Sequence, residues 1–317
     1  MNKIKYGNTG VNVSPIIFGG NVFGWTLDED RAFTILNEFF EKGFNTIDSA
    51  NIYSNWVPGN AGSESETIIG KWMKQKSNRD QMTVITKVGA PLQSDKPNTS
   101  KKYILEEVER SLKHLQTDYV DIYFNHFDDT VTPVEETLEA FDEIVKSGKA
   151  RVAAASNISP ERLTESLAVS DEKNLVSYAG LQPEYNLYDR QKFEENYLAI
   201  AEQHGLAVTP YYSLASGFLT GKYKTADDFK NSARGAGIEK RYNNERGMKV
   251  LQALREVAVN NDTAMSVVAL AWMMKQPFIT APIASGTKKQ HIEDFAKAVA
   301  FNLTDEDFSK LLNASEY

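Results

Sequence analysis

Short β-favouring segments alternate with amphipathic segments along the whole chain, and this alternation limits the folds that the chain can adopt. A parallel strand needs a crossover connection, usually a helix, before the next strand can pair with it. The eight predicted strands are residues 16–20, 44–48, 82–86, 119–124, 150–155, 178–181, 206–209 and 279–283. Eight such units predict an α/β fold, a (β/α)8 or TIM barrel.

Helix-start signals occur in the segments between these strands. The Ser-x-x-Glu at 63–66 has the spacing of a capping box, in which each side chain bonds the backbone of the other residue. Thr132-Pro133 and Ser159-Pro160 each place a capping residue before a proline at the first helical position. Helices are predicted over residues 28–42, from 63 through 72, over 103–115, from 132, from 159, and over 190–204.

Three stretches do not fit the repeat. Residues 3–14 alternate apolar and polar side chains around Asn8-Thr9-Gly10, which predicts an N-terminal β-hairpin. Residues 90–101 predict a shorter polar loop. Residues 222–247, after the seventh strand, are polar and glycine-containing without clear periodicity, and they exceed what a barrel loop requires. We expect this long strand-7 loop to act as a lid.

The domain organisation follows from the evenness of the 317-residue chain, in which no linker or change of composition separates two halves. We therefore predict a single barrel domain over residues 1–317. A doubly wound sheet is the alternative, and such sheets often carry Gly-x-Gly-x-x-Gly after the first strand. The chain lacks that motif at this position, which favours the barrel.

Charge and cysteine content exclude several classes of function. The chain has 35 basic and 43 acidic residues, a net charge of −8, and no run of lysine or arginine longer than two. It is therefore a poor candidate for binding nucleic acid or an anionic membrane. The absence of cysteine excludes disulfides, thiolate catalysis and cysteine-ligated metals. Because no signal peptide or membrane-length apolar run is present, we expect a cytoplasmic soluble protein.

Polar side chains lie at the predicted strand ends, which a barrel brings together on one face. The segment FNTIDSANIY at 44–53 ends a strand at Asp48 and carries Tyr53 on the following loop. Lys87 follows the next strand, and His126 follows the one after that. The later strands are followed by Ser156, Asn157, Gln182 and Tyr212. This convergence predicts an active site.

A tyrosine, a lysine, a histidine and an aspartate together suit the transfer of one proton. A phenol has an unperturbed pKa of about 10, and an adjacent ammonium can lower it by roughly one to three units. We expect Asp48 to hold Lys87 in place and keep it charged, and His126 to orient a substrate oxygen. Such a site protonates an oxygen as negative charge develops on it, as carbonyl reduction requires. None of these side chains supplies a hydride, so a nicotinamide cofactor is implied.

Other chemistries have less support, although Lys87 alone is compatible with a solvated charge and His126 alone with a core histidine. The four histidines form no metal-spaced pair, so no metal site is predicted. No serine lies in a nucleophile elbow. A Schiff-base lysine in an isomerase or aldolase would need Lys87 free of a carboxylate, whereas Asp48 is expected to pair with it.

Nine segments in order along nearly the whole chain form one recognisable set: YGNTGVNVSPIIFGG, FNTIDSANIY, GSESETIIGKW, ITKVG, YVDIYFNHFDD, VKSGKARVAAASNISPERL, LQPEYNLYDR, YYSLASGFLTGKY and IASGTKKQHIEDF. As a set, these segments resemble the motifs of the aldo-keto reductases. The first three, together with the loop YSNWVPGN, look most like the bacterial branch related to aryl-alcohol dehydrogenases and potassium-channel β subunits.

The resemblance implies a reductase of aldehydes or ketones that uses NADPH, with NADH possible, and in which Tyr53 is the general acid. Its catalytic tetrad would be Asp48, Tyr53, Lys87 and His126. The nicotinamide carboxamide would be held by Ser156, Asn157 and Gln182, and its ring would stack on Tyr212. The ribose side is implied for Gly20 and Asn21, and the pyrophosphate side for Ser213, Leu214, Ser216, Gly217, Leu219 and Lys222.

The adenosine end of the cofactor is implied to lie along one stretch near the C-terminus. Its residues are Ser285, Gly286, Thr287, Lys288, His291 and Asp294. Lys288 stands where arginine is commoner, and it offers a point charge rather than a bidentate fork. Phe295 occupies a place where asparagine is usual. Lys288 and Lys289 supply two cations here, which favours NADPH over NADH.

Five aromatic residues near the predicted mouth are candidates for the substrate pocket: Phe23, Trp25, Trp56, Phe127 and Tyr242. Aromatic loop side chains suit an apolar or flat substrate, and packing of the loops on the barrel rim would explain them equally well. The expected partner is a small-molecule carbonyl compound. A nucleotide-binding regulator in the manner of channel β subunits is the alternative, and the intact tetrad argues against it.

Overall fold

The computed structural model describes residues 1–92, 95–223, 226–231 and 235–317. Among these residues, eight parallel strands form one sheet. They are β3 Ile17–Gly19, β4 Thr46–Asp48, β5 Thr83–Val88, β6 Val120–Asn125, β7 Ala150–Ser156, β8 Tyr178–Gln182, β9 Ala207–Val208 and β10 Ile283–Ala284. Their order in the sheet is β10-β3-β4-β5-β6-β7-β8-β9, so neighbours in the chain are neighbours in space.

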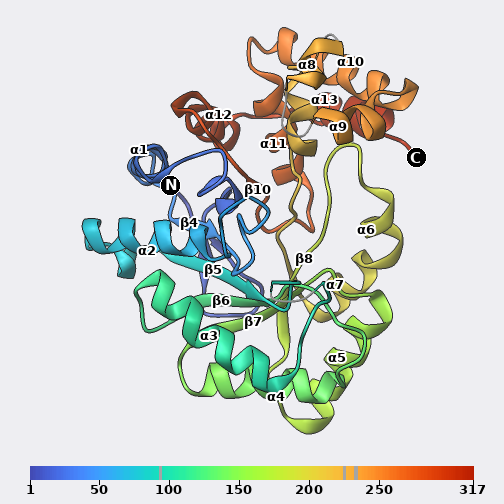
Figure 1. Ribbon diagram of the computed structural model, residues 1–317. Helices are drawn as coiled ribbons and strands as arrows, with labels where there is room; N and C mark the ends of the chain where they lie inside the picture. The colour runs from blue at the N-terminus through green and yellow to red at the C-terminus, as the bar shows by residue number, and fades with distance from the viewer. Residues whose placement is uncertain (93–94, 224–225, 232–234) are drawn as a thin grey trace.

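Backbone hydrogen bonds between the two outermost strands close the sheet. Ala281 N donates to Val208 O at 3.4 Å, and Ile283 N donates to Pro210 O at 2.9 Å. These bonds join the segment around β9 to the segment leading into β10, whose other edge pairs with β3. The predicted (β/α)8 barrel is confirmed, with its helices arranged around the outside of the sheet (Figure 1).

The described helices are α1 Glu29–Glu41, α2 Glu64–Lys76, α3 Lys101–Leu115, α4 Val134–Lys146, α5 Pro160–Lys173, α6 Gln191–Asn196, α7 Leu198–His204, α8 Ala226–Lys230, α9 Gly235–Tyr242, α10 Glu245–Asn260, α11 Met265–Lys275, α12 Lys289–Ala300 and α13 Asp305–Ala314. Residues 266–273 of α11 are all buried, because α10 and α12 both pack against this helix. Figure 1 shows α8, α9, α10 and α13 together at the top of the molecule.

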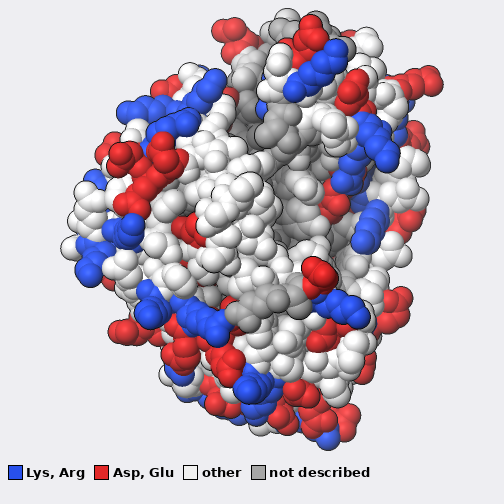
Figure 2. Space-filling model, in the orientation of Figure 1, with Lys and Arg blue, Asp and Glu red and all other residues white. Residues whose placement is uncertain are grey.

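Charged side chains of both signs cover the outline of the molecule in Figure 2, whereas the residues drawn in white predominate among the described ones in the middle of that face. Lysine and arginine are interspersed with aspartate and glutamate, so neither sign forms a continuous field on this face. Among the described residues, no helix combines the length and apolar character needed to cross a membrane.

The predicted N-terminal hairpin is also confirmed, and its side chains fill the barrel interior. Its strands β1 Ile4–Lys5 and β2 Asn12–Val13 pair antiparallel. Tyr6, Val11 and Val13 are buried and pack with inward-facing strand residues such as Ile85 and Ile122. The barrel therefore has an apolar floor beneath the strand ends.

The two-residue period of the strands decides which side chains reach the interior at those ends. In β5, Ile85 belongs to the interior cluster, while Val84 and Val88 belong to the cluster between sheet and helices. The same period turns Lys87 inward and Thr86 outward. By this alternation the inward positions at the strand ends are Asp48, Lys87, His126, Ser156 and Gln182.

The predicted capping box at the start of α2 is wrong. Ser63 has a left-handed φ of 64° and makes no side-chain cap, and its amide donates to Asn51 O at 2.7 Å. Glu66 is fully buried and accepts a hydrogen bond from Thr86 of β5. Because the first turn of α2 packs against the barrel, partners distant in sequence replace the local ones.

The three remaining helix predictions have different outcomes: the Thr132 cap is wrong, the Ser159 cap is confirmed, and the helix at 190–204 is divided. Thr132 does not cap α4, because its hydroxyl donates to Asp129 Oδ2 at 2.6 Å. Ser159 does cap α5, accepting from Arg162 N as expected. The helix predicted over 190–204 is two helices, α6 and α7, separated at Tyr197, whose φ of −123° is not helical.

The long strand-7 segment at 222–247 contains more regular structure than predicted. Its described residues form α8, α9 and the first turn of α10. Residues 224–225 and 232–234 of the expected lid lie outside the described residues, as do residues 93–94 of the predicted loop at 90–101.

Gly180 in β8 offers a test of the barrel floor. A Cβ placed there would lie 2.0 Å from the Tyr6 hydroxyl oxygen. We expect Gly180→Ala to lower the free energy of unfolding by about 1–3 kcal/mol, because Tyr6 must leave a packed interior. Chemical denaturation followed by circular dichroism measures this change.

Gly10 provides the matched control, since a Cβ there would meet nothing within 4 Å. Gly10→Ala should stay within about 0.5 kcal/mol of the wild type. Equal losses in the two variants would show that the contact with Tyr6 does not limit stability.

Candidate active site

The ammonium of Lys87 lies at the centre of a buried hydrogen-bond cluster. Its Nζ donates to Asp48 Oδ2 at 2.7 Å, to Ser49 O at 2.7 Å and to Tyr53 Oη at 2.8 Å. A lysine ammonium has three hydrogens to donate, so every donor is used. The Lys87 side chain is 0% exposed, and the expected ion pair with Asp48 is present.

Tyr53 completes this cluster, because its hydroxyl accepts from Lys87 and donates to Asp48 Oδ2 at 3.1 Å. Burial first, and then the charge and hydrogen bond of Asp48, raise the pKa of Tyr53 well above its ordinary value. The sequence-based expectation of a lowered pKa is therefore wrong for this structure, since burial and a nearby carboxylate outweigh the single cation. The phenol keeps its proton and can donate it to an oxygen that becomes negative.

Burial also acts on the cation itself. It lowers the pKa of Lys87, and the charge and hydrogen bond of Asp48 oppose that effect. The ammonium is thus maintained by its carboxylate partner rather than by solvent, as the sequence led us to expect for Asp48.

His126 lies beside the phenol, with its ring centroid 6.0 Å from that of Tyr53. Burial, followed by the positive charge of Lys87, lowers the pKa of His126 well below its ordinary value, so the ring is neutral. Its Nδ1 is buried and has no hydrogen-bond partner among the described residues. A neutral imidazole has one donor and one acceptor nitrogen, which suits a hydrogen bond to a substrate oxygen.

Of the three polar residues predicted at the later strand ends, Gln182 and Asn157 bond directly to Asp48 and His126, and Ser156 bonds to Gln182. Gln182 Nε2 donates to Asp48 Oδ1 at 3.0 Å. The Ser156 hydroxyl donates to Gln182 O at 2.8 Å, and Asn157 Nδ2 donates to His126 O at 2.9 Å. The structure therefore brings these side chains together around the cluster.

Tyr211 is a site residue that the sequence reasoning missed. Its hydroxyl donates to Asn157 Oδ1 at 3.0 Å, whereas the predicted Tyr212 is 45% exposed and has a left-handed φ of 59°. Both tyrosines contribute to the raised pKa of Tyr53. Tyr211 is in phase with the inward-facing Ala207 of β9, so the strand alternation could have identified it.

The segment after Tyr212 is a tight left-handed turn. Ala215, Ser216 and Gly217 in the 3₁₀ segment η3 Ala215–Thr220 have successive left-handed φ values of 47°, 54° and 98°. The amides of Ala215 and Gly217 are engaged within the turn, where they donate to Tyr212 O at 2.6 Å and to Leu214 O at 2.8 Å. A Cβ at Gly217 would lie 2.9 Å from Lys222 Nζ, so glycine lets this lysine approach. Of the other predicted residues, Ser213 and Leu219 are buried and Leu214 is partly buried.

Two cations from separate loops meet near His291. After burial, the charges of Lys288 and Lys222 both lower the pKa of His291. Thr287 N donates to His291 Nδ1 at 3.1 Å, and a Cβ at Gly286 would lie 3.0 Å from His291 Cβ. Lys288 is also the residue before the N-terminus of α12. Cations beside a helix N-terminus fit an anion such as a phosphate.

The ends of β3 and β10 are joined by one hydroxyl. Ser285 Oγ lies 2.7 Å from Gly19 O and 2.8 Å from Asn21 Oδ1. A Cβ at Gly20 would lie 2.8 Å from Ser65 Oγ, so this turn also requires a glycine. The predicted residues Gly20, Asn21 and Ser285 therefore form one neighbourhood.

The remaining residues of the predicted adenosine end are already engaged with protein groups. Asp294 Oδ2 accepts from Ser266 at 2.8 Å. Lys289 Nζ lies 3.6 Å from Glu38 Oε2, so its charge is partly compensated. Phe295 is buried and packs in the hydrophobic core.

Three of the five predicted pocket aromatics lie around Tyr53. Trp56 is 47% exposed, with ring centroids 6.4 Å from Tyr53 and 5.6 Å from Trp25. Phe127 lies 4.8 Å from the ring of His126. Together they form an aromatic wall beside Tyr53 and His126.

The other two predicted pocket aromatics lie in packed interiors. Phe23 is 0% exposed and stacks on Phe18 at 5.2 Å, because the 3₁₀ turn η1 Gly20–Val22 directs it into the core. Tyr242 is buried, stacks on Phe218 at 5.0 Å and donates to Asp189 at 2.6 Å. Neither presents an open surface to a substrate.

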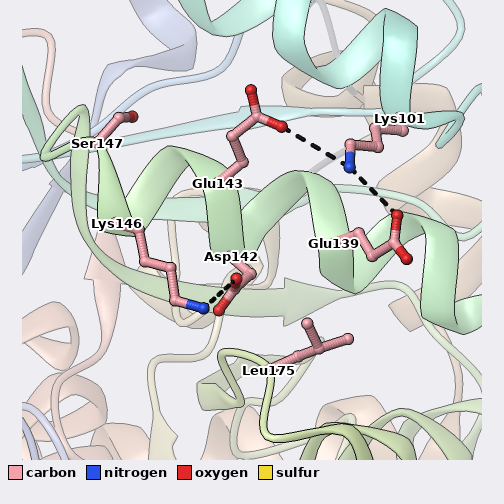
Figure 3. A pocket seen from close by; sticks show the side chains of 7 residues that line it. All are labelled: Lys101, Glu139, Asp142, Glu143, Lys146, Ser147 and Leu175. Carbon is pink, nitrogen blue, oxygen red and sulfur yellow. Dashed lines mark hydrogen bonds and ion pairs between the residues drawn. The ribbon is translucent and has the colours of Figure 1, made fainter.

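A hollow of about 480 Å³ on the outer surface is unrelated to this constellation. It is lined by Lys101, Glu139, Asp142, Glu143, Lys146, Ser147 and Leu175. Its charged side chains pair with one another, Lys101 with two glutamates and Lys146 with Asp142 (Figure 3). Across the described residues, no group of three or more histidines and carboxylates is arranged to hold a metal.

Comparison with known proteins agrees with this geometry. Residues 15–316 match the Aldo/keto reductase family. The uncharacterized oxidoreductase YrpG of Bacillus subtilis (strain 168) is 34% identical, over 97% of this chain and 93% of its own length. The aldo-keto reductase YhdN of the same organism is 30% identical, over 97% and 91%. A probable voltage-gated potassium channel subunit beta of Arabidopsis thaliana is 31% identical, over 92% and 89%. The chain therefore belongs to the aldo/keto reductase family.

Proposed function

We propose that this protein reversibly reduces aldehydes or ketones to alcohols, with NADPH as hydride donor and Tyr53 as general acid. The observation that carries the proposal is the closed triangle of Lys87, Asp48 and Tyr53 beside a neutral His126. Membership in a family of oxidoreductases supports the same reaction class.

Each member of the tetrad has one task in the proposed mechanism. When bound, the nicotinamide supplies the hydride. Tyr53 transfers its hydroxyl proton to the substrate oxygen, and Lys87 stabilises the phenolate that remains. Asp48 holds Lys87 in place and keeps it charged, while His126 orients the substrate oxygen through a hydrogen bond.

The groups that would hold the cofactor fit its chemistry from end to end. Ser156, Asn157 and Gln182 are proposed for the carboxamide, and Gly20 and Asn21 for the ribose beside it. The cations Lys222 and Lys288, the second of which directly precedes the N-terminus of α12, suit phosphate groups. The proposed pyrophosphate and adenosine contacts are Ser213, Leu214, Ser216, Gly217, Leu219, Lys222, Ser285, Gly286, Thr287, Lys288, His291 and Asp294.

The substrate is proposed to be a small carbonyl compound with an apolar or flat body. Trp25, Trp56 and Phe127 lie around the proton donor, and the exposed face of Trp56 is available for stacking.

Tyr53→Phe tests the proton donor. We expect turnover of an aromatic aldehyde to fall by about a hundred- to ten-thousand-fold, because the general acid is lost. NADPH affinity should be unchanged. NADPH oxidation and a fluorescence titration of bound NADPH measure the two quantities.

Near-normal turnover in Tyr53→Phe would contradict the mechanism. A wild type that binds NADPH tightly but reduces no aldehyde or ketone in a panel would instead favour the nucleotide-binding regulator.

Lys288→Ala tests the preference between the two cofactors. We expect the Kd for NADPH to rise about tenfold and the Kd for NADH to stay close to that of the wild type, because only NADPH carries the 2′-phosphate. Lys289→Ala is the matched control and should have a smaller effect, since Glu38 already compensates its charge. Equal losses for both cofactors would show that Lys288 does not read the phosphate.

The adjacent tyrosines can be distinguished by the same titration. We propose that Tyr211 supports the nicotinamide end, because its hydroxyl bonds Asn157 and its position is in the inward phase. Tyr211→Ala should therefore weaken NADPH about tenfold, more than Tyr212→Ala does. A larger loss for Tyr212→Ala would assign the stacking ring to Tyr212, as the family resemblance implied.

A further inference from the structure

Glu66 is a buried carboxylate that the proposed mechanism does not use. It lies in the first turn of α2 and is 0% exposed. Thr86 Oγ1 donates to its Oε1 at 2.5 Å, while its Oε2 has no hydrogen-bond partner among the described residues. Over the same residues, Glu66 forms no ion pair with a lysine, arginine or histidine within 4.0 Å. A buried carboxylate without a cation is costly, so its presence needs a reason.

The groups that act on Glu66 come from several elements around it. Besides burial and Thr86, Ser63 before α2 and Ser111 of helix α3 lower the pKa of Glu66 through their hydroxyls, and the positive form of His114, also of α3, would lower it further. Strand β6 contributes Tyr123, whose pKa is raised first by burial and then by the charge of Glu66. Burial is the largest effect on Glu66 and raises its pKa, whereas the Thr86 hydroxyl bond opposes that rise.

Strand β5 connects Glu66 to the active site, because Thr86 and Lys87 are consecutive and point to opposite faces of the strand. Thr86 faces α2 and holds Glu66, while Lys87 faces the barrel interior. Burial lowers the pKa of Lys87; Asp48 raises it, and Glu66 then adds to that effect. The two carboxylates therefore act on Lys87 from opposite faces of β5, Asp48 through a direct ion pair and Glu66 from behind Thr86.

The charge of Asp48 is shared among several donors. Its two carboxylate oxygens accept from Lys87, Tyr53 and Gln182. Around Lys87, Asp48 and Tyr53 lie on the side of β4, and His126 lies on the side of β6. His126 is neutral and contributes no charge. Apart from Asp48, the negative charge that acts on Lys87 is therefore that of Glu66.

We propose that Glu66 is a positioning residue that acts through Lys87, keeping it as an ammonium from behind the barrel wall while Tyr53 donates its proton. The inference rests on the proposed reduction. The transferred proton leaves Tyr53 Oη for the substrate oxygen, and Lys87 keeps all three of its own. The ammonium then lies beside the new phenolate, which its charge stabilises.

The sign of the pH effect follows directly. The active form has Lys87 protonated, so activity falls as pH rises through the pKa of Lys87. Removing the charge of Glu66 lowers that pKa, and the fall in activity then begins at a lower pH.

Glu66→Gln keeps the shape of the side chain and removes its charge. In a profile of kcat/KM for carbonyl reduction against pH, we expect the basic limb to move down by about one pH unit. Activity at the low-pH plateau should stay near that of the wild type. Glu66→Asp retains the charge, so its basic limb should lie close to the pH of the wild-type limb.

Glu107→Gln is the matched control. Glu107 is also a buried carboxylate facing this region, but Arg110 pairs with it at 2.7 Å and it is absent from the charges that act on Lys87. The Glu107→Gln substitution should leave the basic limb of the pH profile in place.

Thr86→Val is a second variant. It removes the hydrogen-bond donor to Glu66 and makes the Glu66 carboxylate harder to ionise, so the basic limb should move to lower pH, as in Glu66→Gln.

A readout without turnover separates this proposal from the proposed function. In protein with isotope-labelled lysine, the Nζ signal of Lys87, assigned by its loss in Lys87→Met, can be titrated by NMR in the wild type and in Glu66→Gln. A lower Lys87 pKa in the variant supports the proposal even if no carbonyl compound is reduced. An unchanged Lys87 pKa, or a uniform loss of activity with the limb in place, would overturn it.

Discussion

The burial of the Lys87 ammonium is the constraint on which the rest of the site depends. Moving an ammonium out of water costs several kcal/mol unless a counter-charge and matched acceptors replace the solvent. Asp48, the Ser49 carbonyl and Tyr53 supply all three acceptors. Two of these come from the end of β4 and the residue after it, and the parallel pairing of β4 with β5 places them beside Lys87. The strand pairing that builds the barrel therefore also supplies the acceptors that allow Lys87 to be buried.

Strand alternation distributes the functional side chains between the two faces of the barrel wall. Inward positions at the strand ends carry Asp48, Lys87 and His126, above an interior into which the N-terminal hairpin packs. The outward position next to Lys87 carries Thr86, which anchors Glu66 on α2. The two-residue period thus turns Lys87 toward Asp48 inside the barrel and Thr86 toward Glu66 outside it. In the proposal above, both carboxylates act on the Lys87 ammonium.

Burial also reverses a simple electrostatic expectation about the proton donor. In water, a nearby ammonium would make a phenol more acidic. Within this cluster, burial and the Asp48 carboxylate raise the pKa of Tyr53 instead. A phenol that keeps its proton until an oxygen nearby becomes negative suits the reduction proposed for this protein, and that property arises only from the assembled environment.

Period and motif, both readable along the chain, determined the barrel, the hairpin and the strand-end positions of Asp48, Lys87 and His126. Local patterns carry this information because side-chain direction repeats every two residues in a strand. Only the tertiary structure decided that Glu66 is buried rather than capping, that Phe23 faces the core, and that Tyr211 bonds Asn157. The bonds of Glu66 and Tyr211 depend on partners 20 and 54 residues away in sequence. All three outcomes depend on burial, which no local pattern contains.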